Sequence, residues 1–417
     1  MATVVELRCS ICERSYAPDS VTYTCPICGM VGTLDVLFDY PTLARDVSPA
    51  ALAGSRDTSM WRYRALLPLQ PASEVPPLRV GGTPLMEAPR LAADIGVRRA
   101  WVKDDGLNPT GSLKDRASSM VVARALEQNI PVVATASTGN AAAALAGVGA
   151  SVGAGRVKVI IFVPASAPEG KIAQLLVYGA TVVLVDGSYD TAFDLCWQMC
   201  QEQGWYCRNT GINPYTTEGK KTVSYEIAEG LGWRAPDALV VSVGDGNIIA
   251  GVHKGFYDLL QMGWIERIPK LIGVQATGSS PLVRAWQNGT CAQDMQAEDA
   301  HTLADSISAG QPSDRAKALR AVRATGGAFV AIDDTDILAA IPTFARLTGV
   351  FAEPSCAITY AGAKAAVESG YLKPEEEVVF LSTGSGLKDV RRAQQSVVLP
   401  TPVSPTLEAV RVALQIF

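Results

Sequence analysis

The chain has 417 residues, of which 48% are hydrophobic and 18% charged, and its formal net charge is −5. This length is enough for two or three domains with large buried cores. The net negative charge argues against sequence-independent binding of nucleic acid, which needs a basic surface to displace counterions. The longest apolar stretch, Ala141–Ala150, is too short to span a bilayer. With no membrane segment and no leader-like N-terminus, a cytoplasmic protein is expected.

Four of the nine cysteines form two close pairs, Cys9 with Cys12 and Cys25 with Cys28. Two such C-x-x-C pairs supply the four thiolates that zinc prefers. Iron would accept the same ligands, and four unrelated thiols are the alternative, but this paired spacing rarely arises by chance. Residues 1–36 hold two arginines against four acidic residues, a poor footprint for binding DNA or RNA. We therefore predict a structural zinc ribbon, folded by its metal.

After an irregular connector over residues 35–80, short apolar runs alternate with segments of helical spacing. Apolar runs bounded by turn residues predict buried parallel strands. The predicted strands are Val132–Ala136, Val157–Val163, Thr181–Val185, Ala238–Val243, Leu271–Gln275, Phe329–Ile332 and Val378–Leu381. The predicted helices are Lys114–Glu127, Glu169–Tyr178, Thr191–Gln203, Glu218–Glu229 and Ile248–Leu260. Repeated β-α units predict an α/β fold of doubly wound parallel sheets with helices on both faces.

The expected domain organisation is a zinc ribbon over residues 1–36 followed by a catalytic region over 37–417. Within that region we expect a large domain, formed by about 37–117 and 223–417, and a smaller domain inserted at about 118–222. The polar segment Gln287–Asp314 is predicted to be a surface excursion. Ligands of such sheets bind beyond the carboxyl ends of the strands, so the loops at those ends are the candidate functional segments.

The segment Lys103–Arg116 is the richest in candidate chemistry. Its turn residues end at Ser112, which is predicted to cap a helix that begins near Lys114. The dipole at a helix N-terminus disfavours a cation and lowers the pKa of a lysine, which makes Lys114 a candidate nucleophile. On this segment alone, an ordinary surface lysine is an equally good interpretation.

Three loops after predicted strands favour the catalytic interpretation. The loop Ser137–Asn140 offers hydroxyls and an amide at a helix N-terminus, which suits a carboxylate. The loop Gly244–Ile248 is a glycine-rich turn whose backbone N–H groups can hold a phosphate, with the Asp245 side chain expected to turn away. The loop Ser382–Gly386 places a neutral hydroxyl where it can meet a weakly basic ring nitrogen. One lysine and three such loops form a coherent set.

In this order and spacing, GSLKDR, ASTGN, VGDGN and STGSGLKD resemble the motifs of the threonine synthase family, pyridoxal-phosphate (PLP) enzymes of the tryptophan-synthase β fold type, or fold type II. The segment Asn209–Thr222 and the cysteine ribbon are similar to that family too, and the resemblance covers essentially the whole chain. The chain departs from the family pattern at Leu113, where phenylalanine is usual, at Asp245, and over Glu353–Cys356, where alanine is common. These departures leave room for a different substrate.

The resemblance implies that Lys114 carries the cofactor and then transfers protons. Asn140 would bind the ring oxygen of the cofactor, and Thr383 would face its pyridine nitrogen. The implied ligands of the cofactor phosphate are Gly244, Asp245, Gly246, Asn247 and Ile248. The implied substrate-binding residues are Ser137, Thr138 and Gly139 for the carboxylate and Asn213 for a substrate phosphate, with Lys171 or Lys220 near it.

The family reaction converts O-phosphohomoserine and water into threonine and phosphate, and its relatives imply a homodimer. The alternatives are cysteate synthesis from O-phosphoserine and dehydration of serine or threonine. A non-enzymatic scaffold is disfavoured because Lys114 is retained. A zinc hydrolase is disfavoured because a four-cysteine zinc site has no open position for water.

Overall fold

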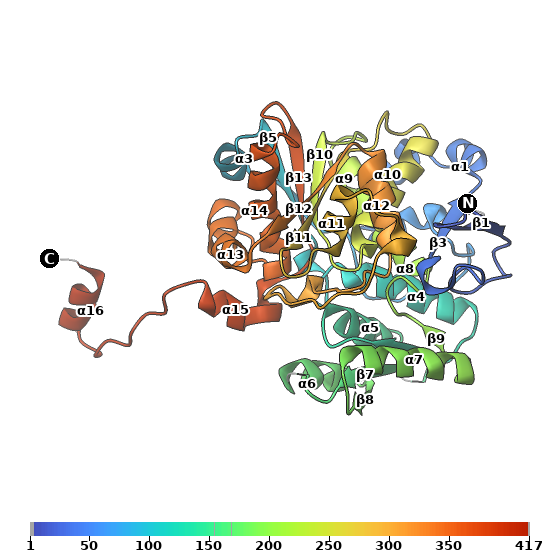
Figure 1. The fold of residues 1–417 in the computed structure, drawn as a ribbon, viewed down its shortest axis with the longest axis horizontal. Coiled ribbons are helices and arrows are strands. Elements are labelled where there is room, and N and C mark those ends of the chain that lie inside the picture. The colour runs from blue at the N-terminus through green and yellow to red at the C-terminus, as the bar shows by residue number, and fades with distance from the viewer. Residues whose placement is uncertain (1–3, 154, 168, 416–417) are drawn as a thin grey trace.

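The computed structural model describes residues 4–153, 155–167 and 169–415. It is an α/β protein with a large and a smaller sheet unit, a small N-terminal sheet, and a C-terminal segment that extends away from the body (Figure 1). Among the described residues, no helix combines the length and the apolar character that crossing a bilayer requires.

The N-terminal sheet is antiparallel. Its strands are β2 (Ser15–Tyr16), β1 (Val4–Cys9) and β3 (Leu34–Phe38), in that order across the sheet. The third strand continues two residues beyond the predicted boundary at residue 36. The connector that follows contains short helices, because Asp39 and Ser48 cap helices that begin near a proline. These helices are α1 (Tyr40–Asp46), α2 (Pro49–Ala53) and the 3-10 helix η2 (Met60–Leu66).

The large sheet has six strands in the order β12-β11-β10-β13-β5-β4. They are β4 (Leu85–Glu87), β5 (Arg99–Asp104), β10 (Ala238–Ser242), β11 (Lys270–Ala276), β12 (Ala328–Ile332) and β13 (Glu377–Ser382). Five strands are parallel, and β4 pairs antiparallel with β5 at one edge. Every residue of β10 and β13 is buried, since helices cover both faces of the sheet.

The central strands lie between two layers of helices (Figure 1), and alternate residues of these strands pack against each layer. Leu239 and Leu271 pack with one layer, whereas Val240 and Ile272 pack with the other. The first layer contains α9 (Thr222–Gly230), α10 (Asn247–Gln261), α11 (Pro281–Gln287) and α12 (Arg315–Ala324). The second contains α3 (Pro89–Ile95), α13 (Asp334–Thr348) and α14 (Pro354–Glu368). The sheet is therefore doubly wound, as predicted.

The smaller sheet is wholly parallel, with strand order β8-β7-β6-β9, and lies within the predicted inserted segment 118–222. Its strands are β6 (Val132–Ala136), β7 (Lys158–Pro164), β8 (Thr181–Val185) and β9 (Tyr206–Cys207), and its helices are α5 (Asn140–Ser151), α6 (Glu169–Val177) and α7 (Tyr189–Gln203). A Cβ at Gly149 would lie 2.3 Å from Cγ2 of Val159. The small residues of α5 therefore let this helix pack closely on the sheet.

Seven strands were expected from the sequence, and each forms with bounds that differ by no more than one residue at either end. The central strand β5 has no counterpart among them, because it ends in two charged residues, Lys103 and Asp104, that are nevertheless buried. The predicted helix Glu218–Glu229 is two helices, α8 (Tyr215–Lys220) and α9, which meet at Lys221.

Candidate active site

Two adjoining cavities lie at the carboxyl ends of the large-sheet strands. The Lys114 cavity encloses about 440 Å³ of space between protein atoms and the Asn140 cavity about 310 Å³, and both volumes include space open to solvent. Ser306 and Ser355 line both cavities, so the two are neighbours. The Lys114 cavity is also lined by Lys114, Thr210, Lys220, the segment 242–249, Ile307 and Thr383. The Asn140 cavity is also lined by Gly139, Asn140, Lys171, Ala304, Asp305, Glu353, Pro354, Lys388 and Asp389.

Lys114 is the first residue of α4 (Lys114–Glu127), as predicted. The expected cap is wrong: the hydroxyl of Ser112 is buried without a hydrogen-bond partner. The loop is held by the backbone, because the N–H of Leu113 donates to the Thr383 carbonyl at 2.9 Å and that of Ser385 to the Gly111 carbonyl at 3.0 Å. These bonds place Lys114 and Thr383 on neighbouring segments of one cavity wall.

The start of α4 is anchored by a buried ionic cluster around Arg116. This guanidinium is fully buried and donates to Asp105 at 2.6 and 2.9 Å and to Glu226 at 2.6 and 2.8 Å. Lys103 completes the cluster with a 2.6 Å bond to Glu226. Charge-assisted, bidentate pairs of this kind fix geometry tightly. Lys114, two residues before Arg116, is therefore held at a defined position.

The electrostatic setting of Lys114 favours a neutral amine. Burial lowers the pKa of Lys114, the Glu353 carboxylate acts in the opposite direction, and Arg208 lowers it further. Among the residues that the structure describes, none forms an ion pair or a hydrogen bond with the Lys114 side chain. An unpaired amine with a lowered pKa is the state that a nucleophile or general base requires.

The loop Gly244–Ile248 leads from β10 into α10 and requires its two glycines. Gly246 has φ of +86°, in the left-handed region. A Cβ at Gly244 would lie 2.9 Å from the Ile307 backbone. The loop lines the Lys114 cavity at the N-terminus of a 15-residue helix, where backbone N–H groups and the helix dipole favour an anion.

The donors around this cavity fit PLP. The hydroxyl of Ser242 is buried, lines the cavity and has no hydrogen-bond partner, so a ligand can satisfy it. The hydroxyl of Thr383 lines the same cavity and lies 3.1 Å from the Cys356 sulfur. Cys356 also accepts the N–H groups of Thr383 and Gly384 at 3.0 and 2.9 Å, which fixes this loop. An unpaired lysine, a phosphate loop and neutral hydroxyls match an aldehyde, a phosphate and a pyridine ring.

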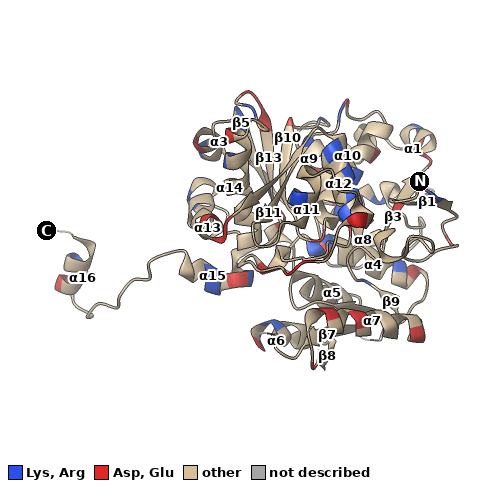
Figure 2. Cartoon of the chain, viewed as in Figure 1, with Lys and Arg blue, Asp and Glu red and all other residues tan. Residues whose placement is uncertain are grey.

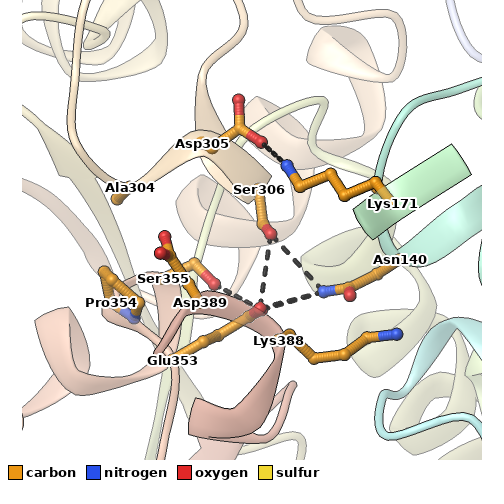
Figure 3. A pocket seen from close by; sticks show the side chains of 11 residues that line it. Asn140, Lys171, Ala304, Asp305, Ser306, Glu353, Pro354, Ser355, Lys388 and Asp389 are labelled. Atoms are coloured by element: carbon orange, nitrogen blue, oxygen red, sulfur yellow. Dashed lines mark hydrogen bonds and ion pairs between the residues drawn. The ribbon is translucent and has the colours of Figure 1, made fainter. Parts of the chain in front are cut away.

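The Asn140 amide lies in the adjoining cavity (Figure 3). It is buried and donates to both carboxylate oxygens of Glu353 at 3.0 and 3.1 Å. The Ser355 hydroxyl donates to the same carboxylate at 2.6 Å, and Ser306 lies 3.5 Å from it. Glu353, which the sequence marked only as a departure, is therefore the centre of the polar network in this cavity.

Two asparagines predicted to bind ligands have backbone or side-chain partners inside the protein. Asn213 is fully buried, donates to the Cys207 carbonyl at 2.9 Å and accepts from the Tyr215 N–H at 3.0 Å. It does not line either cavity. Asn247 does line the Lys114 cavity, and its amide group contacts Thr217, Lys220 and Asp314.

The loop Ser137–Gly139 is half-buried at the start of α5. The Gly139 N–H donates to the Ser137 hydroxyl at 3.2 Å. Gly139 lines the Asn140 cavity, whereas Ser137 and Thr138 are absent from its lining. Lys171, which also lines this cavity, pairs with Asp305 at 2.7 Å (Figure 3).

Sequence reasoning missed several residues of the two cavities. Asp305, Ser306 and Ile307 come from the segment Gln287–Asp314, which was predicted to be a surface excursion. Most of this segment is exposed or half-buried, as predicted, but Asp314 at its end is fully buried against Asn247. The segment is polar and lacks helix or strand periodicity, so only tertiary contacts could reveal its role.

The four N-terminal cysteines form one cluster in which all the sulfur atoms lie within 4.8 Å of one another. The sulfurs of Cys12 and Cys25 are 3.8 Å apart, the separation expected for tetrahedral ligands about 2.3 Å from zinc. A Cβ at Gly32 would lie 2.7 Å from Cβ of Cys25, so only glycine fits beside the cluster. Burial raises the pKa of Cys25, but hydrogen bonds from Tyr16 and from the Cys28 N–H outweigh it and lower the pKa to about 6.

The cysteine ribbon contacts both sheet units. On the large unit, Asp35 pairs with Arg320 at 2.6 Å, within a group of basic residues on α10 and α12 (Figure 2). On the smaller unit, the Tyr23 hydroxyl accepts the N–H of Cys207 at 2.9 Å, and its ring packs edge-on against Trp197. The ribbon is thus an integral part of the structure.

Comparison with known proteins agrees with this geometry. Residues 77–384 match the family described as "Pyridoxal-phosphate dependent enzyme". The chain is 39% identical to a threonine synthase from Methanosarcina acetivorans over 98% of both chains, and 38% identical to one from Methanocaldococcus jannaschii over 92% of both. Its fold is similar to threonine deaminase isoform 2 from Solanum lycopersicum, with a TM-score of 0.63, 23% identity and coverage of 76% of this chain and 88% of the other.

The fold and the cavity define a PLP-dependent enzyme of fold type II. Because similarity to the curated relatives runs over nearly the full length of both chains, the chain belongs to the threonine synthase family.

Proposed function

We propose that this protein is a threonine synthase, which converts O-phosphohomoserine and water into L-threonine and phosphate. The observation that carries the proposal is the Lys114 cavity, where an unpaired lysine faces a helix N-terminus built for a phosphate. The adjoining cavity adds Lys388, whose ammonium contacts the neutral amide of Gln174 at 3.3 Å and can bind an anionic group. The relatives named above are threonine synthases.

When bound, the cofactor's conjugated ring withdraws the negative charge that forms at the substrate Cα. The amine of Lys114 is the base for the Cα proton, since its pKa is lowered and it lines the cavity. The reaction balances when protons leave Cα and Cβ and phosphate leaves Cγ with the C–O electron pair. Protons then return to Cγ and Cα, water gives its hydroxyl to Cβ, and the remaining proton of that water goes to the released phosphate.

The remaining site assignments belong to the same proposal. The N–H groups of the loop Gly244–Ile248, with the Ser242 hydroxyl, would hold the cofactor phosphate. The Thr383 hydroxyl would serve the ring nitrogen. Glu353 orients the Asn140 amide toward the ring oxygen, as its two bonds to that amide support. The loop Ser137–Gly139 holds the substrate carboxylate at the N-terminus of α5.

Zinc in the cysteine ribbon is also part of the proposal. Four thiols at tetrahedral separations leave no open ligand position, so the metal has a structural role. The other five cysteines are free thiols, which suits a reducing compartment and hence the cytoplasm. Metal analysis of the purified protein would find zinc at one ion per chain, and iron or no metal would contradict this assignment.

We also infer a homodimer. The segment after α15 (Val390–Gln395) leaves the body and ends in α16 (Leu407–Leu414), which has no buried residue (Figure 1). Its apolar side chains include Leu407 and Val412, which are 77% and 70% exposed. A second copy can bury them symmetrically. Light scattering would show a dimer, and deletion of residues 396–417 would shift it toward a monomer.

The function is tested by incubating the holoenzyme with O-phosphohomoserine and measuring phosphate and threonine together. Equal amounts of both products would support the proposal. Two parallel assays distinguish the alternatives, one with O-phosphoserine and sulfite and one with serine or threonine alone. Cysteate in the first, or a keto acid and ammonia in the second, with no product from O-phosphohomoserine, would overturn the substrate assignment and leave the PLP fold intact.

A further inference from the structure

A buried thiol, Cys356, lies beside Thr383 and outside the Lys114 cavity. It belongs to the first turn of α14, has no exposed surface, and its sulfur is 3.1 Å from the hydroxyl oxygen of Thr383. Thr383 lines the cavity, whereas Cys356 lines neither of the two cavities. An effect of Cys356 on a ligand of the Lys114 cavity would therefore pass through Thr383.

The hydrogen bonds of the Cys356 sulfur show in which direction the contact with Thr383 runs. The backbone N–H groups of Thr383 and Gly384 donate to the sulfur at 3.0 and 2.9 Å, so its acceptor capacity is used by the backbone. The S–H group is left as a donor, and it has two oxygens within reach: the Thr383 hydroxyl at 3.1 Å and the Gly384 carbonyl at 3.3 Å. The carbonyl already accepts the Glu353 N–H at 3.1 Å, whereas the hydroxyl has no other partner among the described residues. The hydroxyl is thus the nearer acceptor and the one without another bond.

The sulfur carries its proton at neutral pH. Burial raises the pKa of Cys356 to about 12, and the Glu353 carboxylate acts in the same direction. A thiol donates one proton, and a threonine hydroxyl can accept a proton while it donates its own. When the Thr383 oxygen accepts the S–H, its own proton points away from the sulfur and is free for a ligand of the cavity that Thr383 lines.

We propose that Cys356 is a positioning residue, which orients the Thr383 hydroxyl so that it donates to the ring nitrogen of the cofactor. A neutral pyridine nitrogen only accepts hydrogen bonds, so the direction of this hydroxyl decides whether the bond forms. Without the thiol, the hydroxyl would have no partner on the protein side and could rotate. The inference rests on the proposed function, because there the ring nitrogen is assigned to Thr383.

The test uses the holoenzyme reconstituted with PLP that is isotope-labelled at its ring nitrogen. The nuclear magnetic resonance of that nitrogen reports the hydrogen bond that it accepts, and equilibrium dialysis gives the dissociation constant of the cofactor. The variants are Cys356→Ala, Cys356→Ser, Thr383→Val, and the double variant that combines Cys356→Ala with Thr383→Val. Cys196→Ala is the matched control, because Cys196 is also fully buried but belongs to α7 and lines neither cavity.

We expect Cys356→Ala to shift the nitrogen resonance toward that of a pyridine without a hydrogen-bond donor. The cofactor should bind about three- to tenfold more weakly, as for the loss of one hydrogen bond. Cys356→Ser retains a donor and should restore most of both changes, and Cys196→Ala should change neither. Thr383→Val should shift the resonance further in the same direction. In the Thr383→Val background, Cys356→Ala should add nothing, because it acts through the hydroxyl that is already absent.

A second measurement leaves Cys356 in place and serves if Cys356→Ala does not fold. The infrared S–H stretch of Cys356 should move to higher frequency in Thr383→Val, since the thiol loses its acceptor. An unchanged S–H stretch would overturn the inference, and so would an unchanged nitrogen resonance in folded Cys356→Ala.

An effect of Cys356→Ala that persists in full in the Thr383→Val background would mean that Cys356 supports the loop and does not orient the hydroxyl, so the inference would be wrong. If Thr383→Val itself leaves the nitrogen resonance unchanged, the assignment of the ring nitrogen in the proposed function is wrong, and the inference fails with it. No readout requires turnover, so failure of the proposed reaction would be seen separately.

Discussion

The cysteine ribbon and the catalytic cavity are assembled in opposite ways. The ribbon takes its four sulfurs from 20 consecutive residues, Cys9–Cys28, and local turns such as Gly29, with φ of +62°, bring them together. The cavity takes its walls from segments that span Lys114 to Thr383. A site of the first kind can be predicted from spacing alone, whereas a site of the second kind depends on how the sheets pack.

The largest expected effect is a loss of catalytic activity that leaves the ribbon unchanged. Replacing Lys114 with alanine should reduce threonine formation by at least about 10³-fold, since it removes the base and the cofactor's attachment point. The absorbance band of the bound cofactor should be lost, while the zinc content of the ribbon stays unchanged. Comparable turnover in the variant would show that the cavity chemistry has been placed on the wrong residue.

Substitution of a zinc ligand should disrupt the ribbon without changing any residue that lines the cavity. Cys25→Ser should remove the bound zinc, because metal binding supplies most of the folding free energy of so small a unit, on the order of 10 kcal/mol. Metal analysis and thermal unfolding would measure the loss, with Cys291→Ser, at an exposed cysteine, as the control. Retained zinc in Cys25→Ser would refute the four-cysteine site.

Asp258 of α10 joins this helix to the segment after the ribbon, because it accepts the Tyr40 hydroxyl at 2.6 Å. Burial acts to raise the pKa of Asp258, but the ammonium groups of Lys221 and Lys254 lower it to about 2. Asp258→Asn should cost about 3–5 kcal/mol at neutral pH, because it leaves buried cations with fewer partners. Urea unfolding would measure this cost against the control Asp336→Asn, at an exposed position.

The same cluster predicts a pH dependence. Because the folded-state pKa of Asp258 lies below the unfolded value of about 3.9, its stabilisation is complete above about pH 4 and is lost as the pH falls toward about 2. The difference in unfolding free energy between wild type and Asp258→Asn should therefore shrink over this range. A difference that stays constant from pH 6 to pH 2 would contradict the ionic account.

The smallest expected effect is on stability, and it tests the hydrogen bonds that join the ribbon to β9. Tyr23→Phe removes one hydroxyl that accepts the Cys207 N–H at 2.9 Å and donates to the Trp205 carbonyl at 3.3 Å. The expected cost is about 1–2 kcal/mol, with faster hydrogen exchange at the Cys207 amide. Tyr371→Phe is the control, since no hydrogen bond of its hydroxyl is present in the described structure. Unchanged exchange in Tyr23→Phe would mean that the ribbon does not restrain β9.

The sequence predicts the regular parts of this fold well, because buried parallel strands are continuous apolar runs and α4 has the predicted bounds Lys114–Glu127. It does not predict β5, whose Lys103 is buried only because Glu226 lies 2.6 Å away. Nor does it place Ser306 or Ile307 at the cavity, since their segment is brought there by contacts between distant parts of the chain. Asn213 shows the reverse: a residue chosen by motif resemblance is occupied by the backbone.

The central claim is that Lys114 carries the cofactor, and borohydride reduction of the holoenzyme tests it most directly. Reduction fixes the cofactor to the amine that holds it, and mass spectrometry of the digested protein then locates the adduct. The account predicts a pyridoxyl-phosphate group on Lys114 and on no other lysine. An adduct on Lys220 or elsewhere, with Lys114 unmodified, would contradict it.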